Sequence, residues 1–206
     1  DRMFRPSDVV TAPDGSVFIA DWHDNGVGGH GARSLKTGRV FRLAPKGSKP
    51  TKVKYDLSTV GGAIKALQSP NKAAYYQAHK ALVKMGEKAL APLKDLYDSD
   101  NPVYTARALW ILAKLDTKNA IQLGFSHDNE DIRIVAIRAA RQHNIKDAAF
   151  LKKIAADKNP QVRREVCLAL REFDGPEAAE IWADLAVQFD GKDRWYVEAL
   201  GIAADY

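Results

Sequence analysis

Residues 127–140 read His-Asp-Asn-Glu-Asp-Ile-Arg-Ile-Val-Ala-Ile-Arg-Ala-Ala, an acidic loop that leads into an apolar, alanine-rich run. Loops of the same kind recur at 68–72, 98–102 and 157–161, and a weaker copy lies at 189–193. We therefore expect a stack of helix pairs, an architecture that usually binds other molecules rather than catalysing a reaction. Four of the loops share an asparagine at a spacing of roughly 30 residues, the range of helical solenoids: Asn71, Asn101, Asn129 and Asn159.

Helical periodicity surrounds each loop, with one apolar stretch before it (an A helix) and another after it (a B helix). Prolines agree with this pattern, because Pro102 and Pro160 stand just ahead of B helices and Gly175-Pro176 opens an A helix. The predicted fold class is mainly α, an α-α superhelix of about five helix pairs. The A helices are expected near 59–67, 88–97, 118–125, 147–156 and 176–188, and the B helices near 72–85, 103–115, 131–142, 161–173 and 193–204.

The first 45 residues follow a different pattern. The turn triplet Pro13-Asp14-Gly15 stands between Val9-Val10 and the strand-like run 16–22, which is a short-range hairpin signal. A third strand is expected at 39–43, and the stretch after it is rich in proline, glycine and lysine, which is typical of a linker. The predicted organisation is a β-strand segment at 1–45, a linker at 46–57 and a helical solenoid at 58–206.

Composition indicates a globular protein with a sizeable core, since 46% of the residues are hydrophobic and 28% are charged. The net charge of +5 is spread over interspersed acids and bases, so we expect no nucleic-acid partner. No apolar run reaches the length of about 18 residues that a membrane span needs, so we expect no membrane insertion by this segment. The N-terminus has neither an initiator methionine nor an apolar signal core, and we interpret the chain as a piece of a longer protein.

The third and fourth loops are followed by Ile132-Arg133 and Val162-Arg163. An acidic loop, a branched apolar residue, an arginine and an alanine-rich helix together resemble the HEAT repeat. In that family the arginines tend to form a ladder with aspartates of successive repeats. The second repeat departs from the pattern, because it has Tyr104-Thr105 at these positions. The resemblance implies ladder bases at Arg133 and Arg163, with candidate partners at Asp128, Asp131 and Asp157.

A second set of motifs resembles the bacterial family of membrane-bound dehydrogenases. In that family a β-propeller similar to sugar and sorbosone dehydrogenases is followed by HEAT repeats and commonly by a c-type cytochrome domain. The resemblance implies the last strands of a propeller here, a quinone and haem c in the parent protein, and a periplasmic or secreted location. The chain has no Cys-x-x-Cys-His sequence, so we expect no cofactor in this fragment itself. The motifs lie at 4–9, 12–16, 20–22, 26–30, 38–43 and 190–201.

Polar side chains cluster around the glycine-rich loop after the second predicted strand. Asp21, Asp24 and Asn25 carry oxygen donors of the kind that calcium prefers, so they form a candidate metal site. The alternative is that these side chains make turns with the backbone. By analogy with propeller enzymes, His30 is a candidate cofactor-binding residue in the cleft of the parent protein. The glycines of 26–31 fit a dinucleotide-binding motif formally, but we reject it because a strand rather than a helix follows.

The leading functional hypothesis is a non-catalytic HEAT-repeat scaffold, a fragment of a larger, cytochrome-linked, dehydrogenase-like redox protein. In that role the solenoid positions domains of the parent protein and binds protein partners, since stacked repeats act as a semi-rigid arm. The alternative is a free-standing protein–protein interaction module with no redox role. A third reading, catalysis at the loop 21–30, lacks both a nucleophile–base pair and a complete set of metal ligands.

Overall fold

The computed structural model describes residues 4–22 and 38–205. The chain divides into two compact units, Asp1–Met85 and Gly86–Tyr206, and each is considered by itself. The division falls inside the predicted solenoid at 58–206, and the predicted domain boundaries stay a prediction. None of the described helices is long and apolar enough to cross a membrane.

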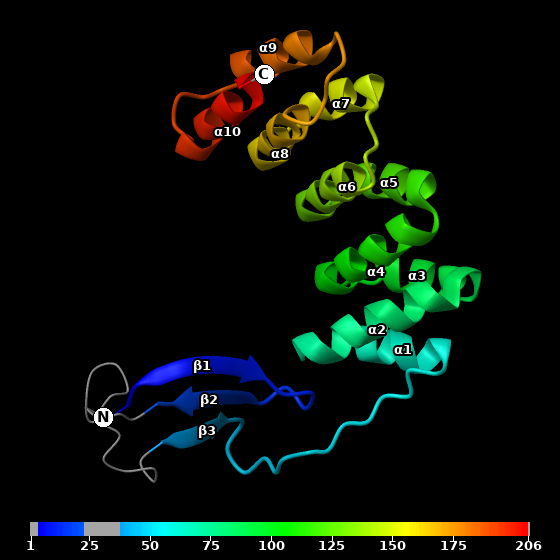
Figure 1. Ribbon diagram of the computed structural model, residues 1–206, viewed down its shortest axis with the longest axis vertical. Coiled ribbons are helices and arrows are strands. Elements are labelled where there is room, and N and C mark those ends of the chain that lie inside the picture. The colour runs from blue at the N-terminus through cyan, green and yellow to red at the C-terminus, as the bar shows by residue number, and fades with distance from the viewer. Residues whose placement is uncertain (1–3, 23–37, 206) are drawn as a thin grey trace. The chain divides into compact units, whose positions relative to one another are not determined.

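The first unit begins with a three-stranded antiparallel sheet in the order β1-β2-β3 (Figure 1). In the turn between the first two strands, the Asp14 carboxylate accepts hydrogen bonds from the hydroxyl and the backbone N–H of Ser16, which hold the pKa of Asp14 well below its usual value. Gly15 has a φ of 83°, a conformation that glycine adopts without strain. The three predicted strands are confirmed as β1 (Pro6–Thr11), β2 (Val17–Asp21) and β3 (Arg39–Leu43).

Apolar side chains occupy both faces of this sheet. Val9 pairs with Ile19, which pairs in turn with Phe41, on one face; Val10 pairs with Phe18 on the other. The adjacent residues Val9 and Val10 are 64% and 51% exposed, so one strand presents apolar surface in both directions. Such a sheet needs further structure over it, as the strand pattern led us to expect.

One helix pair, α1 (Val60–Leu67) and α2 (Lys72–Met85), completes the first unit. Asn71, from the first recurring loop, accepts a hydrogen bond from the N–H of Ala74 in the first turn of α2. Its side-chain amide also donates to the carbonyl of Thr11 at the end of β1. Within this unit, therefore, the recurring loop joins the sheet to the helix pair.

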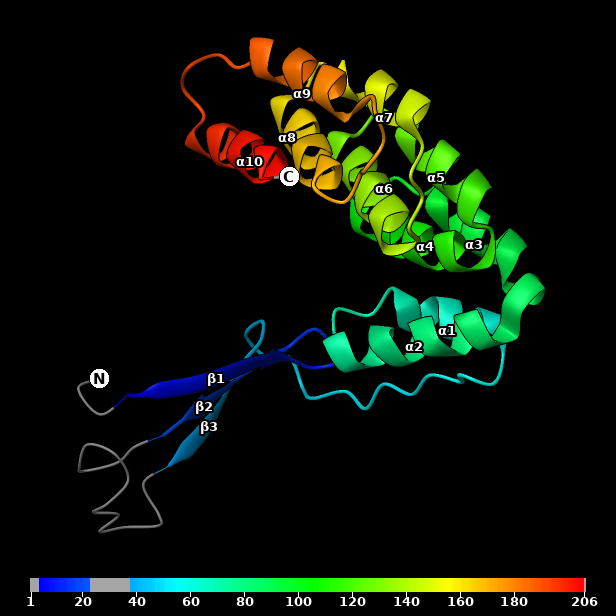
Figure 2. The same cartoon turned by 45° about the horizontal axis from the view of Figure 1, so that its top comes forward.

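The described part of the second unit stacks four further helix pairs in chain order. They are α3 (Leu90–Tyr97) with α4 (Pro102–Leu115), α5 (Thr117–Phe125) with α6 (Glu130–Gln142), α7 (Ala148–Ala155) with α8 (Pro160–Leu170), and α9 (Ala178–Val187) with α10 (Arg194–Ala204), preceded by the 3₁₀ turn η1 (Gly86–Ala89). The A helices α3, α5, α7 and α9 form one layer, and the B helices form the other (Figure 2). With α1/α2 as the first repeat, these pairs are the second to fifth repeats. The predicted mainly helical fold of helix pairs is confirmed.

The connection between the fourth and fifth repeats differs from its predicted boundaries. We expected the B helix to run to residue 173, but α8 ends at Leu170, because the N–H groups of Glu172 and Phe173 bond to carbonyls three residues back in a 3₁₀-like turn. Pro176 lies in the turn before the next helix, and α9 begins two residues later, at Ala178. The Gly-Pro dipeptide therefore extends the connection rather than opening the helix.

The recurring asparagines cap the B helices of the second unit. Asn101, Asn129 and Asn159 each accept, through the side-chain oxygen, the backbone N–H of the residue two positions later. Asp193 does the same at the start of α10. These bonds satisfy donors that a helix N-terminus otherwise leaves unpaired. The spacing of the loops is therefore the spacing of helix N-caps.

The core of the second unit lies between its helix pairs, where leucine and isoleucine pack against small residues. Ala136 and Ala139 of α6 are completely buried. A Cβ added to Gly124 of α5 would lie 2.8 Å from the Cβ of Ala136, so the two helices approach too closely for any larger residue at this position. Small residues at these positions therefore set the separation of α5 and α6.

Replacement of Ala139 by glutamate should lower the free energy of unfolding by several kcal/mol, because Ala139 is completely buried and the charge would have no partner. Urea unfolding followed by circular dichroism measures the change. Gln142→Glu places the same charge at an exposed site at the C-terminal end of the same helix. The helix dipole opposes a negative charge there, so stability should fall by less than about 1 kcal/mol. An Ala139→Glu variant as stable as this control would show that the buried face of α6 has been misassigned.

Candidate functional site

Arg133, near the start of α6, joins the third repeat to the fourth. Its Nε and Nη2 donate to the two carboxylate oxygens of Asp157, at 2.7 and 3.0 Å. Its Nη1 donates to the backbone carbonyls of His127 and Asp128, at 2.9 and 2.8 Å. One planar guanidinium group thus binds the loop of its own repeat and the loop of the next.

Both side chains of this ion pair are nearly buried, with 8% of Arg133 and 9% of Asp157 exposed. The hydrogen bond to Asp157 raises the pKa of Arg133. Burial alone would raise the pKa of Asp157, but the hydrogen bonds from Arg133 and from the N–H of Asn159 outweigh it and leave this pKa below its usual value. Removing either partner would leave a nearly buried charge, so the pair ties the two repeats together.

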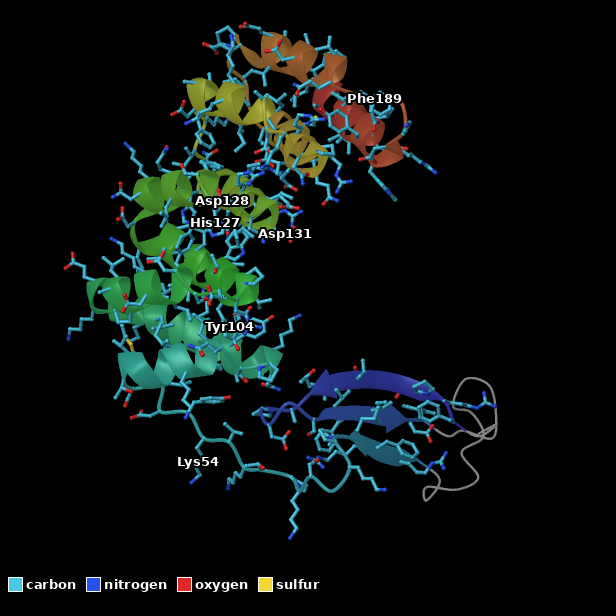
Figure 3. The ribbon with its side chains drawn as sticks, turned by 180° about the vertical axis from the view of Figure 1, so that it is seen from behind. Lys54, Tyr104, His127, Asp128, Asp131 and Phe189 are labelled. Carbon is cyan, nitrogen blue, oxygen red and sulfur yellow. The ribbon has the colours of Figure 1, made fainter. Side chains whose placement is uncertain are left out.

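The other two candidate partners have different roles. Figure 3 labels Asp128 and Asp131 beside His127, where the chain enters α6. Asp128 is exposed and contacts Arg133 through its backbone carbonyl. Asp131 is exposed in the first turn of α6, where a negative charge interacts favourably with the helix dipole. The carboxylate that meets the Arg133 guanidinium is therefore that of the following repeat, Asp157.

Arg163 occupies in α8 the position of Arg133 in α6, four residues after the capping asparagine. Its Nη1 donates to the carbonyl of Asp157 in its own loop at 2.7 Å. Towards the fifth repeat, the guanidinium carbon lies 5.7 Å from the centre of the Tyr196 ring. Nε donates to the Tyr196 hydroxyl at 3.4 Å, and Nη2 donates to the backbone carbonyl of Gln188 at 3.5 Å. The fifth loop has Gly191 where the fourth has Asp157. The ladder therefore changes here from an ion pair to a cation–π contact with hydrogen bonds to uncharged groups.

Thr105 and His127 take the corresponding positions in the second and third repeats. Thr105, in the arginine position of α4, is buried, and its hydroxyl lies 3.2 Å from the carbonyl of Ser99. His127, in the position of Asp157, accepts the N–H of Asn129 through Nδ1 and meets the Tyr97 ring edge-on at 5.6 Å. Sequence reasoning missed His127, although counting two residues back from each capping asparagine would have identified the position.

Further ion pairs between the third, fourth and fifth repeats share one direction: the base belongs to the earlier repeat and the acid to the later one. The most buried of these acids is Glu165, whose side chain is 6% exposed; Arg138 binds it at 2.8 Å and Arg141 approaches it at 3.6 Å. Glu165 is a second residue that sequence reasoning missed, because a charged residue on a helix is usually solvated. The remaining pairs are Arg141–Glu172, Lys146–Asp174, Lys152–Glu180 and Arg164–Asp193.

Three of the candidate metal and cofactor residues of the N-terminal loop, Asp24, Asn25 and His30, lie outside the described residues. Asp21 is buried at the end of β2, where its carboxylate accepts the N–H of Arg5 at 2.7 Å and binds Arg39 at 2.8 Å. Within 4–22 and 38–205, no group of three or more His, Cys, Asp and Glu side chains is arranged to hold a metal ion. The described contacts of Asp21 are therefore those of a residue that holds the sheet together.

The contacts of these residues are those of a structural role. Cys167 is completely buried in α8, and burial raises its pKa to about 12, which disfavours the reactive thiolate. Most of the ion pairs at the repeat interfaces are hydrogen-bonded, and Arg141–Glu165 and Arg164–Asp193 are longer contacts. Their combined effect is to hold consecutive repeats in a fixed arrangement.

Asp157→Asn should lower the free energy of unfolding by on the order of 2 kcal/mol at pH 7, since it removes a charge-assisted hydrogen bond. Because the folded-state pKa of Asp157 is lowered, this contribution is present above the unfolded-state value of about 4 and is lost as the pH falls through the folded-state value. Urea unfolding of both proteins at pH 7, and at the lowest pH at which the wild type stays folded, measures the difference.

Asp128→Asn is the matched control, because it changes an exposed aspartate in the preceding loop, and it should alter stability by less than about 0.5 kcal/mol. A difference between the wild type and Asp157→Asn that stays constant with pH would contradict the ionised, hydrogen-bonded state of Asp157.

The family model of HEAT repeats matches residues 117–201, which span the third to fifth repeats and both ladder arginines. No curated protein sequence matches the chain significantly. The segment that carries the ion pairs is thus the segment that is similar to HEAT repeats, a class of solenoid that forms extended binding surfaces for other proteins.

Proposed function

We propose that this chain is a non-catalytic scaffold that binds protein partners and holds them in fixed relative positions. The observation that carries the proposal is the series of ion pairs that joins the third, fourth and fifth repeats, nearly buried at Arg133–Asp157. A stack fixed in this way acts as a semi-rigid arm, because each repeat is positioned by its neighbours. The B helices also present exposed apolar side chains that a partner can cover: Val103, Trp195 and Ile202.

We further propose that the scaffold is part of a larger, dehydrogenase-like, cytochrome-linked protein that is periplasmic or secreted. The support is the resemblance of the motifs in 4–43 and 190–201, together with a three-stranded sheet that has apolar side chains on both faces. In such a protein the sheet would be one part of a β-propeller that carries a quinone. The solenoid would then set the position of that propeller relative to a domain with haem c.

A free-standing protein–protein interaction module with no redox role is the alternative. The match of residues 117–201 to HEAT repeats is sufficient to support it, because that match involves no part of the sheet. The two proposals agree on the solenoid and differ in what adjoins it. The adjoining sequence therefore decides between them.

The gene that encodes this chain provides the test of the redox proposal. We expect the reading frame to encode further β-strand repeats ahead of residue 1 and a Cys-x-x-Cys-His sequence beyond residue 206. A reading frame with neither feature would leave the interaction module as the function.

For the scaffold itself, we expect no turnover when this chain alone is incubated with sugar or alcohol donors and a dye acceptor. Measurable turnover would contradict a non-catalytic role.

A further inference from the structure

An open groove lies between α8 and α10, two B helices that lie side by side (Figure 1). Its apolar lining comes from Leu168, Ala199 and Ile202. Trp195, at the start of α10, also lines the groove and is 68% exposed. An exposed indole beside an apolar recess is typical of the residues that anchor protein interfaces.

The two walls of this groove carry opposite charges, since Arg164 comes from α8 and Glu198 from α10. Each of these two residues has an intramolecular ion-pair partner at a distance that is long for such a pair. Arg164 lies 3.8 Å from Asp193, and Glu198 lies 3.4 Å from Arg194. The Arg194–Glu198 pair is solvent-exposed and contributes little to stability. The Arg164–Asp193 pair is partly buried, but its separation of 3.8 Å is beyond hydrogen-bonding distance. Both groups can therefore exchange these partners for others at small cost.

We propose that the groove between α8 and α10 is a two-fold interface that joins two copies of this chain. A two-fold axis brings the same patch of each copy together, so the patch has to be complementary to itself. This patch combines a projecting aromatic side chain with an apolar recess, and a base with an acid. In the dimer Trp195 of each copy enters the recess of the other, and Arg164 pairs with Glu198 across the axis twice.

Charge favours a second copy over a strongly charged peptide as the occupant of the groove. An acidic peptide would place like charge against Glu198, and a basic peptide would place like charge against Arg164. A second copy related by a two-fold axis matches both charges, because it supplies one of each sign.

Sedimentation equilibrium of the full chain, over a concentration series up to roughly millimolar, tests the proposal. We expect a reversible dimer whose dissociation constant rises by on the order of tenfold or more in Trp195→Ala. Val187→Ala is the matched control, because Val187 is 83% exposed in the same repeat and does not line the groove. It should leave the dissociation constant unchanged. A wild type that stays monomeric, or a dimer that Trp195→Ala leaves intact, overturns the proposal.

Reversing the charge of Arg164 or Glu198 provides a second test. Its key result, restored dimerisation in a mixture of the two variants, cannot arise from a general loss of stability. Arg164→Glu and Glu198→Arg should each dimerise weakly, because each variant opposes like charges across the axis. An equimolar mixture of the two should dimerise as the wild type does, because every pair across the axis is then of opposite sign. Circular dichroism of each variant checks that α10 stays folded, since Arg164 also lies near its cap, Asp193. A mixture that associates no better than its components contradicts the two-fold arrangement.

Discussion

The bidentate contact between Arg133 and Asp157 is the interaction on which the arrangement of the helical repeats depends. It lies nearly out of solvent, so each charge requires the other, and separating the third repeat from the fourth would leave both unpaired. The same guanidinium binds two carbonyls of its own loop, so the position of that loop is fixed relative to the loop of the next repeat. The contact of Arg138 with Glu165, whose side chain is 6% exposed, adds a second connection between the same two repeats.

The helix pairs were predictable from the sequence because their signals are local. A capping asparagine and a proline in the first turn mark where a B helix begins, whatever packs against it. The sequence leaves three candidates for the acid that meets Arg133, because Asp128, Asp131 and Asp157 all lie near the start of a B helix. The packing of α6 against the fourth repeat selects Asp157, the one candidate that belongs to the following repeat. The connection after Leu170 was misjudged for a related reason: a 3₁₀-like turn and an α-helical turn look alike in the apolar pattern.

The character of the interfaces changes along the stack, and this bears on the role that we propose. The edge-on contact of His127 with Tyr97 joins the second and third repeats, ion pairs join the third and fourth, and a cation–π contact with Tyr196 contributes between the fourth and fifth. An arm with these contacts resists bending where charges are buried, which suits a scaffold that sets the position of what it binds. Exposed side chains of the B helices remain available, those of α10 to a second copy of the chain and Val103 of α4 to another partner.

A double-mutant cycle on Arg133 and Asp157 tests most directly whether the two residues act as a unit that couples adjacent repeats. The cycle compares the unfolding free energies of the wild type, Arg133→Ala, Asp157→Ala and the double variant, with Lys152 and Glu180, an exposed pair between repeats, as the reference cycle. We predict a coupling energy of about 2 kcal/mol for the nearly buried pair and below about 0.5 kcal/mol for the exposed one. Additive effects of the two substitutions at Arg133 and Asp157 would contradict the account.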